Sequence, residues 1–156
     1  MKKTPVTVLL LLTALVVQAA SAPANFSGNW KFDWAQSKNI GMMGQARIQT
    51  TVTQSKTRVV VDDNSVFSGH ADTQHTIYDL TGKPVTNTSM MAGPATTRSH
   101  WDGARLITGW QSAGAIGGAT TTRIETRYLS ADGKTMYVES ARSGNDPMVM
   151  VFTKDK

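Results

Sequence analysis

The sequence contains no cysteine among its 156 residues. This absence excludes disulfide bonds, thiolate metal sites, cysteine nucleophiles and the lipid-bearing cysteine of a bacterial lipoprotein. Charged residues are also few, at 17%, while hydrophobic residues reach 40%. That balance is too apolar for a disordered chain, and the length suits one domain.

The charge of the chain is modest and of one sign. Sixteen Lys and Arg stand against eleven Asp and Glu, a net charge of +5. Lys2 and Lys3 lie in a segment that we expect to be removed, which leaves fourteen basic against eleven acidic residues, or +3. A charge this small does not indicate a nucleic-acid partner.

The N-terminus has the three parts of a secretory signal peptide. Lys2 and Lys3 give a positive start, residues 6–17 are almost purely apolar, and small residues follow. The apolar run of about 12 residues is shorter than the roughly 20 that a membrane-spanning helix needs. We expect residues 1–22 to be a signal peptide, with cleavage between Ala20 and Ala24. Residues 25–156 would then form the domain exported to the periplasm or medium of a bacterium.

From Phe26 onward the pattern is that of β-strands rather than helices. Apolar residues recur at spacing two and Thr is abundant, which predicts strands. Asp102-Gly103 and Asp132-Gly133 are the strongest hairpin signals, and Asp62-Asp63-Asn64 is interpreted as a further turn. The expected strands are 29–34, 46–54, 58–62, 71–79, 83–87, 95–101, 105–111, 120–129, 134–142 and 148–154.

Such a meander has two edges, and closing into a barrel hides them. We therefore predict an all-β fold, a single antiparallel up-and-down β-barrel of about 8–10 strands, and a monomer. A membrane-spanning barrel would need an apolar outward face. Strand alternation instead places Lys31 on the outside of the first strand, and Arg123, Glu125 and Arg127 on the outside of the eighth. We therefore expect no membrane span.

The same alternation predicts the side chains that line the barrel. Candidate ligand contacts are Trp34, Tyr128, Met136, Arg142, Met148, Met150 and Phe152. Two interpretations stay open, a filled core and a ligand-lined cavity, and the methionines favour a cavity. An inward Arg142 needs a partner, either an anionic ligand or the ring of Trp30.

The segment 26–37, with Gly28 two residues before Trp30, resembles the opening strand of the calycins, which include lipocalins and fatty-acid-binding proteins. Residues 99–106, 129–136 and 151–154 resemble later hairpins of the fatty-acid-binding proteins. The whole chain is most similar to small exported bacterial lipocalin-like proteins. The resemblance implies a lipocalin-like barrel closed at one end by Gly28 and Trp30. Met150 stands where fatty-acid-binding proteins place a carboxylate-binding Arg, and residues 38–45 are too short for their two lid helices.

Metal and catalytic patterns are weak. His70 and His75 stand at an even and an odd position, so one strand would present them on opposite faces. Neither His-x-His nor His-Glu-x-x-His occurs. The soft thioethers of Met42, Met43, Met90, Met91, Met148 and Met150 suit copper(I) but lack a regular spacing. The two glutamates, Glu125 and Glu139, are interpreted as solvated, and Ser27 and Ser99 lack a nucleophile elbow.

We therefore expect no enzyme activity, no metal and no cofactor. The predicted function is the binding of a small apolar or amphipathic molecule by an exported barrel. The alternative is a filled barrel that acts as an interaction module through two rim loops, residues 38–45 and 89–94.

Overall fold

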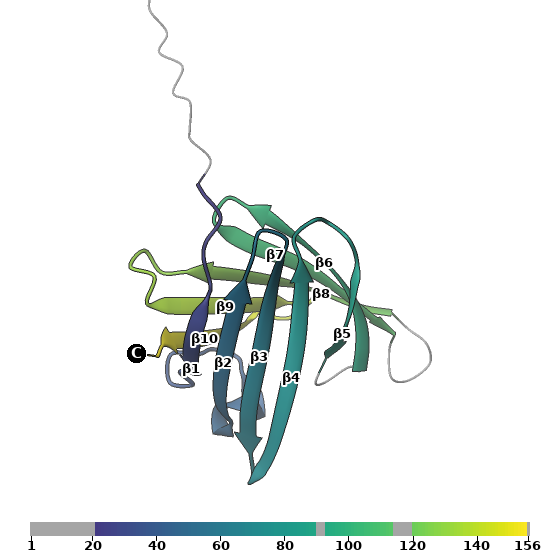
Figure 1. The fold of residues 1–156 in the computed structure, drawn as a ribbon. Helices are drawn as coiled ribbons and strands as arrows, with labels where there is room; N and C mark the ends of the chain where they lie inside the picture. The colour runs from purple at the N-terminus through teal and green to yellow at the C-terminus, as the bar shows by residue number, and fades with distance from the viewer. Residues whose placement is uncertain (1–20, 90–92, 114–119, 156) are drawn as a thin grey trace, which may run out of the picture.

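The computed structural model describes residues 21–89, 93–113 and 120–155, and their fold is a ten-stranded antiparallel barrel (Figure 1). One short 3-10 helix, η1 (Gly41–Gln45), interrupts the strands. All ten predicted strands are confirmed, with ends that shift by a few residues. The strands are β1 (Gly28–Phe32), β2 (Arg47–Gln54), β3 (Arg58–Phe67), β4 (His70–Asp79), β5 (Val85–Ser89), β6 (Gly93–Asp102), β7 (Arg105–Ala113), β8 (Thr120–Leu129), β9 (Thr135–Ala141) and β10 (Met148–Lys154).

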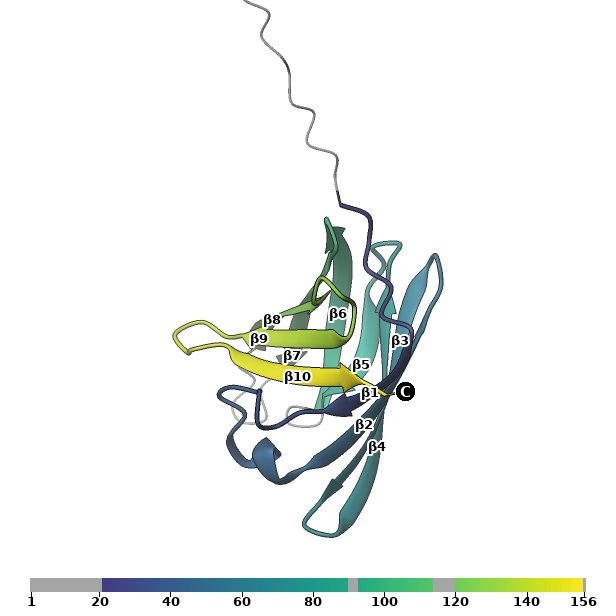
Figure 2. The same cartoon turned by 90° about the vertical axis from the view of Figure 1, so that its left-hand side faces the viewer.

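The strands form one sheet in the order β4-β3-β2-β1-β10-β9-β8-β7-β6-β5. Strands that are adjacent in the sheet are also consecutive in sequence, with the exception of β1 and β10. These two strands pair Trp30 with Lys154 and Phe32 with Phe152. Figure 2 shows this first and last strand lying together. Across the described residues, we find no helix with the length and apolar character needed to cross a membrane.

The predicted turns have two different outcomes. Gly103 and Gly133 have φ angles of 57° and 68°, the left-handed values that make Asp-Gly a favoured hairpin turn. The turn predicted at Asp62-Asp63-Asn64 is wrong, because these residues lie inside β3 and pair with β4. The hairpin turns further on, at Ser68 and Gly69, which both have positive φ.

A side chain closes the barrel where the backbone does not. In the described part of the chain, β4 and β5 are the two sheet edges and share no backbone ladder. The amide of Asn87 in β5 bridges them. Its Oδ1 accepts from the Ile77 N–H at 2.9 Å, and its Nδ2 donates to the Ile77 carbonyl at 2.8 Å and to the Thr97 hydroxyl at 2.8 Å. Asn87 thus pairs with Ile77 as a backbone peptide would.

One end of the barrel is filled by aromatic side chains. Phe26, just before β1, is fully buried and stacks on Trp101 with 5.8 Å between ring centroids. The Trp30 indole N–H donates to the Phe26 carbonyl at 2.9 Å. Gln54 holds the same segment, because it accepts from the Phe26 N–H at 3.0 Å and donates to the Ala24 carbonyl at 2.8 Å. The segment before β1 therefore plugs this end.

Candidate functional site

A charged cluster lies inside the barrel, on the inner faces of β4 and β8. The Tyr78 hydroxyl donates to Glu125 Oε1 at 2.8 Å, and Arg127 Nη2 donates to the Tyr78 oxygen at 3.1 Å and to Glu125 Oε1 at 3.3 Å. Glu125 is 7% exposed and Arg127 is 5% exposed. Charges this deeply buried persist only when they are paired, and here Glu125 and Arg127 are each other's partner.

Asp63 on β3 extends the cluster. Its charge contributes to raising the pKa of Arg127, and its carboxylate accepts a hydrogen bond from the Thr50 hydroxyl. Burial raises the pKa of the Asp63 carboxyl, although the Thr50 hydroxyl and Arg127 act in the opposite direction. Burial also raises the pKa of Tyr78, so its hydroxyl keeps its proton. Burial alone would lower the pKa of Arg127. The acidic groups of Tyr78, Glu125 and Asp63 favour its charged form and hold that pKa above the ordinary value.

Two buried donors of this cluster lack an acceptor. Arg127 Nε and Trp110 Nε1 have no hydrogen-bond partner among the described residues. Trp110 packs edge-on against Tyr78, with ring centroids 6.4 Å apart, and the Arg123 guanidinium lies over the Trp110 ring, 4.2 Å from its centroid. An unsatisfied buried donor costs free energy, so each of these N–H groups favours an acceptor brought from outside the chain.

An apolar wall adjoins the cluster. In register across the sheet, Met150 pairs with Val138 and Val138 with Arg127, while Met148 pairs with Ser140 and Ser140 with Glu125. Phe32 and Phe152 complete the wall, with ring centroids 5.5 Å apart. The arrangement joins thioether and aromatic surface to hydrogen-bonding groups, which is the surface that an amphipathic molecule requires.

The predicted site residues divide between the two sides of the sheet. Met136, Met148, Met150 and Phe152 lie on the face that also carries Val138 and Arg127, as the alternation of β9 and β10 predicts. Met136 is fully buried, and its sulfur lies 3.5 Å from Arg127 Nη1. These four residues are therefore brought together with the charged cluster.

The prediction for β8 is wrong, because its two faces are exchanged. Ile124 is 49% exposed, whereas Glu125 and Arg127 are buried inside. Tyr128, predicted to line the cavity, lies on the outer face, where it stacks on Tyr137 at 5.0 Å and donates to Glu139 Oε1 at 2.5 Å. The two glutamates therefore lie on opposite faces of adjacent strands, and only Glu139 has the outward position predicted for both.

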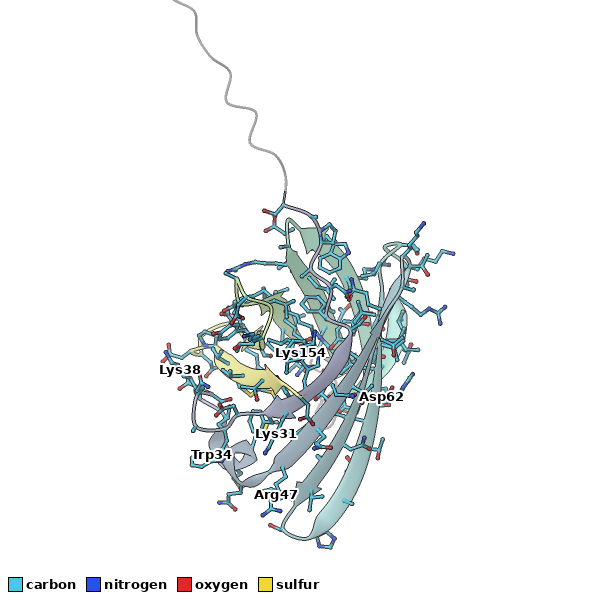
Figure 3. The ribbon with its side chains drawn as sticks, turned by 60° about the vertical axis from the view of Figure 1, so that its left-hand side comes forward. Lys31, Trp34, Lys38, Arg47, Asp62 and Lys154 are labelled. Carbon is cyan, nitrogen blue, oxygen red and sulfur yellow. The ribbon has the colours of Figure 1, made fainter. Side chains whose placement is uncertain are left out.

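Trp34 and Arg142 also lie outside the predicted lining. The chain leaves β1 after Phe32, and Trp34 in the following turn is 62% exposed on the outside of the barrel (Figure 3). Arg142 follows the end of β9 and is exposed. The cation that covers Trp30 is Lys154, with Nζ 5.3 Å from the ring centroid, and it also approaches Gly28, where an added Cβ would lie 3.2 Å from Lys154 Cε.

The interior cluster went unpredicted because single-strand alternation follows apolar residues. By that criterion Ile124 and Tyr128 define the inner face of β8, and the charged residues between them are assigned to solvent. A usable signal was present in the opposite charges two residues apart at Glu125 and Arg127, which share a face and can neutralise each other. Their third partner, Tyr78, is 47 residues away from Glu125 in sequence.

In the part of the chain that the structure describes, no three His, Asp or Glu side chains gather in a position to hold a metal ion. His75 instead lies 2.6 Å from Asp62 on the outer surface. Met42 and Met43 belong to η1, Met148 and Met150 to β10. Met90 and Met91, like the glycine-rich residues 114–118, lie outside the described residues.

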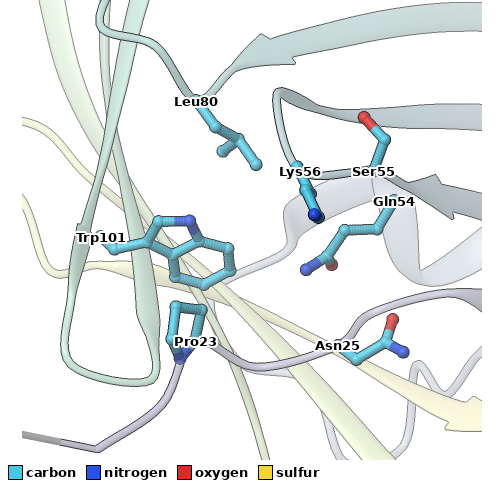
Figure 4. A pocket seen from close by; sticks show the side chains of 7 residues that line it. All are labelled: Pro23, Asn25, Gln54, Ser55, Lys56, Leu80 and Trp101. Atoms are coloured by element: carbon cyan, nitrogen blue, oxygen red, sulfur yellow. The ribbon is translucent and has the colours of Figure 1, made fainter.

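A separate groove of about 510 Å³ lies at the plugged end (Figure 4). Trp101 and Leu80 give it apolar walls, and Lys56 is its charged residue. Pro23 and Asn25 also line the groove, so its shape depends on the segment that follows the expected cleavage site. Its lining has no group of buried polar side chains comparable to the interior cluster, which makes the cluster the stronger candidate site.

No protein-family model and no curated protein matches the chain, but solved structures match most of its length. Human cRBP IV has a TM-score of 0.64 at 16% identity, over 85% of this chain and 100% of its own. The REP1-NXSQ fatty acid transporter has a TM-score of 0.65 at 13% identity, over 83% and 96%. Fatty-acid-binding protein 1 of Echinococcus granulosus has 0.65 at 12%, over 84% and 98%. The chain therefore shares the fold of the fatty-acid-binding proteins.

Proposed function

We propose that this chain is a non-catalytic binding protein that holds a small amphipathic molecule inside its barrel. The apolar part of the molecule would lie against Met148, Met150 and Phe32, and its polar end would meet Tyr78, Glu125 and Arg127. The observation that carries the proposal is the buried Arg127 Nε–H, which lacks an acceptor although the Glu125 carboxylate and the Tyr78 hydroxyl beside it are paired. The shared fold with a fatty acid transporter and a fatty-acid-binding protein supports it.

The chemistry of the described polar residues suits binding better than catalysis. The Ser99 hydroxyl is buried and hydrogen-bonds the Thr108 hydroxyl at 2.9 Å, rather than a general base. Glu125 is committed to Tyr78 and Arg127, and Glu139 accepts from Tyr128 on the other face. A paired-carboxylate mechanism requires two carboxyl groups that flank one scissile bond, and the two glutamates cannot do so from opposite faces of the sheet.

We further propose that the protein is exported after removal of its N-terminal segment, and that it acts as a monomer in the periplasm or medium. Ala24 accepts a hydrogen bond from Gln54 and packs against the core. Cleavage after Ala20 or Ala22 would retain this contact, whereas cleavage after Ala24 would lose it.

Titration of the intrinsic tryptophan fluorescence tests the proposed binding, because Trp110 contacts Tyr78 of the cluster. We expect a saturable change with a long-chain amphiphile, and a co-purified small molecule in native mass spectrometry. The substitution Met150→Asp, which places a charge on the apolar wall, should abolish the fluorescence change, whereas Val66→Asp on an exposed position should not. A folded protein that binds no amphiphile in either measurement would contradict the proposal.

A second candidate is the interaction module that acts through residues 38–45 and 89–94. One specific observation favours it: Met42, in η1, is 74% exposed. Exposed large apolar side chains that form a patch can mark contact sites for other proteins. A folded protein without amphiphile binding, together with loss of a partner on Met42→Ser, would favour this function.

A further inference from the structure

We propose that Glu125 makes the interior site selective for uncharged amphiphiles, whose head is an oxygen acceptor such as an alcohol, ketone or ester, over ionised carboxylates. The inference rests on the proposed function and names the class of ligand for the same site. Three features carry it: the pairing of Arg127, the negative groups around that pair, and the donors left over.

The positive charge of Arg127 is already neutralised within the protein. Glu125 Oε1 accepts both from Arg127 Nη2, at 3.3 Å, and from the Tyr78 hydroxyl, at 2.8 Å. Arg127 Nη2 also donates to the Tyr78 oxygen, at 3.1 Å, so the three side chains form a closed triangle. An anionic ligand could gain this guanidinium only by displacing a carboxylate that is itself buried, and a displaced buried charge is costly.

Further negative charge surrounds the pair. Asp63 interacts electrostatically with both Glu125 and Arg127, so an incoming carboxylate would face two acidic side chains. The second guanidinium, that of Arg123, lies 4.0 Å from the other oxygen of Glu125. Glu125 thus engages both arginines, and together with Asp63 the two acidic side chains balance the two guanidinium groups, so the cluster offers no surplus positive charge to an added anion.

The donors left over fit a neutral oxygen. Arg127 Nε–H and Trp110 Nε1–H are buried without acceptors among the described residues, and each can donate one hydrogen bond. Both atoms are covered in this structure, so a ligand oxygen reaches them only when a neighbouring side chain moves. Arg123 covers the Trp110 ring and keeps 21% of its side chain exposed, which makes it the neighbour that can swing toward solvent.

The test compares two probes of equal chain length, dodecan-1-ol and dodecanoate, at a pH of about 8, where the acid is ionised. Tryptophan fluorescence gives the dissociation constant of each. We expect the unmodified protein to bind the alcohol more tightly than the acid. Glu125→Gln keeps the shape of the side chain but frees the charge of Arg127, so it should raise acid affinity relative to alcohol about tenfold or more.

Glu139→Gln is the matched control, because Glu139 is the other glutamate and lies on the outer face of the adjacent strand. It should leave the ratio of the two dissociation constants unchanged. Tyr78→Phe removes the hydroxyl that joins Glu125 to Arg127, and it should move the ratio toward the acid by a smaller factor. Thermal melting confirms that each variant is folded.

The outcomes separate this inference from the proposed function. Equal or tighter binding of the acid by the unmodified protein overturns the selectivity whether or not Glu125→Gln folds, while leaving the binding function in place. A folded Glu125→Gln protein with an unchanged ratio also overturns it. Binding of neither probe by the folded, unmodified protein overturns the proposed function, and the selectivity with it.

Discussion

At the scale of single residues, Trp30 and Trp34 show how position overrides residue type. The two residues are four positions apart, so a continuous strand would point both side chains to one face. Yet Trp30 is 1% exposed and Trp34 is 62% exposed. The difference arises because β1 ends at Phe32, and Trp34 lies in the turn that follows. A tryptophan contributes to stability through the surface it buries, so the two residues should have very different energetic roles.

Trp30→Ala should lower the free energy of unfolding by about 3–5 kcal/mol, because it leaves a cavity and removes the bond to the Phe26 carbonyl. Trp34→Ala should change it by no more than about 0.5 kcal/mol. Urea denaturation followed by circular dichroism measures both. Equal midpoints for the two variants would show that Trp30 is not in the core.

Asp63 should make stability depend on pH. Burial raises its pKa in the folded protein above the ordinary value of 3.8, so the protonated form stabilises the fold. That contribution is fully present below the ordinary pKa and is lost as the pH rises through the folded value. Asp63→Asn should therefore gain stability relative to the unmodified protein as the pH is raised from about 3.5 to about 7.

Urea denaturation at several pH values measures this difference between the two proteins. The contrasting variant is Asp79→Asn, because hydrogen bonds from Thr81 and from the Lys83 backbone lower the pKa of the exposed Asp79 carboxyl. A lowered pKa stabilises the unmodified protein at higher pH, so the stability difference of this variant should move in the opposite direction. A constant difference for Asp63→Asn across the range would mean that the carboxyl is solvated in the folded protein.

At the scale of elements, the strands were predictable and the faces of one strand were not. Spacing-two alternation and Asp-Gly turns are local signals, and they located all ten strands. The face of β8 is decided by a contact between Glu125 and Tyr78, which alternation within one strand cannot detect. Asp62-Asp63-Asn64 failed as a turn for a related reason, because Thr50 of β2 and His75 of β4 supply partners that keep both aspartates in a strand.

The seam between β4 and β5 gives a prediction for an element. Asn87→Ala should lower the free energy of unfolding by about 2–4 kcal/mol, because it leaves the Ile77 N–H and carbonyl without their partner and each unsatisfied buried group costs about 1–3 kcal/mol. The amide hydrogen of Ile77 should also exchange faster with solvent. Asn64→Ala, which removes an exposed bond to Thr73, is the control and should have little effect. Unchanged exchange at Ile77 would contradict the bridging role of Asn87.

At the scale of the whole molecule, the plugged end and the seam determine how the chain closes on itself. The segment before β1 fills one end through Phe26, and β1 then pairs with β10 to join the two ends of the chain. A chain cleaved within the range expected from the sequence, between Ala20 and Ala24, would retain Phe26 and its hydrogen bond to Gln54.

N-terminal sequencing of the exported protein should find a first residue between Ser21 and Asn25, because the leader has the three parts of a signal peptide and small residues at its exit. Cell fractionation shows where the protein accumulates. A protein that still begins at Met1 and is recovered with the membrane would contradict both the cleavage and the export.

The side-chain bridge of Asn87 also marks the natural place to open the chain. If the present ends were linked and new ends were made in the turn between Asp79 and Val85, every backbone ladder of the sheet would survive. The permuted chain would run β5 to β10 and then β1 to β4, so that sequence order and sheet order coincide throughout. The barrel is thus a circular permutation of a simple meander, and the present termini interrupt that meander at its β1–β10 ladder rather than at its weakest junction.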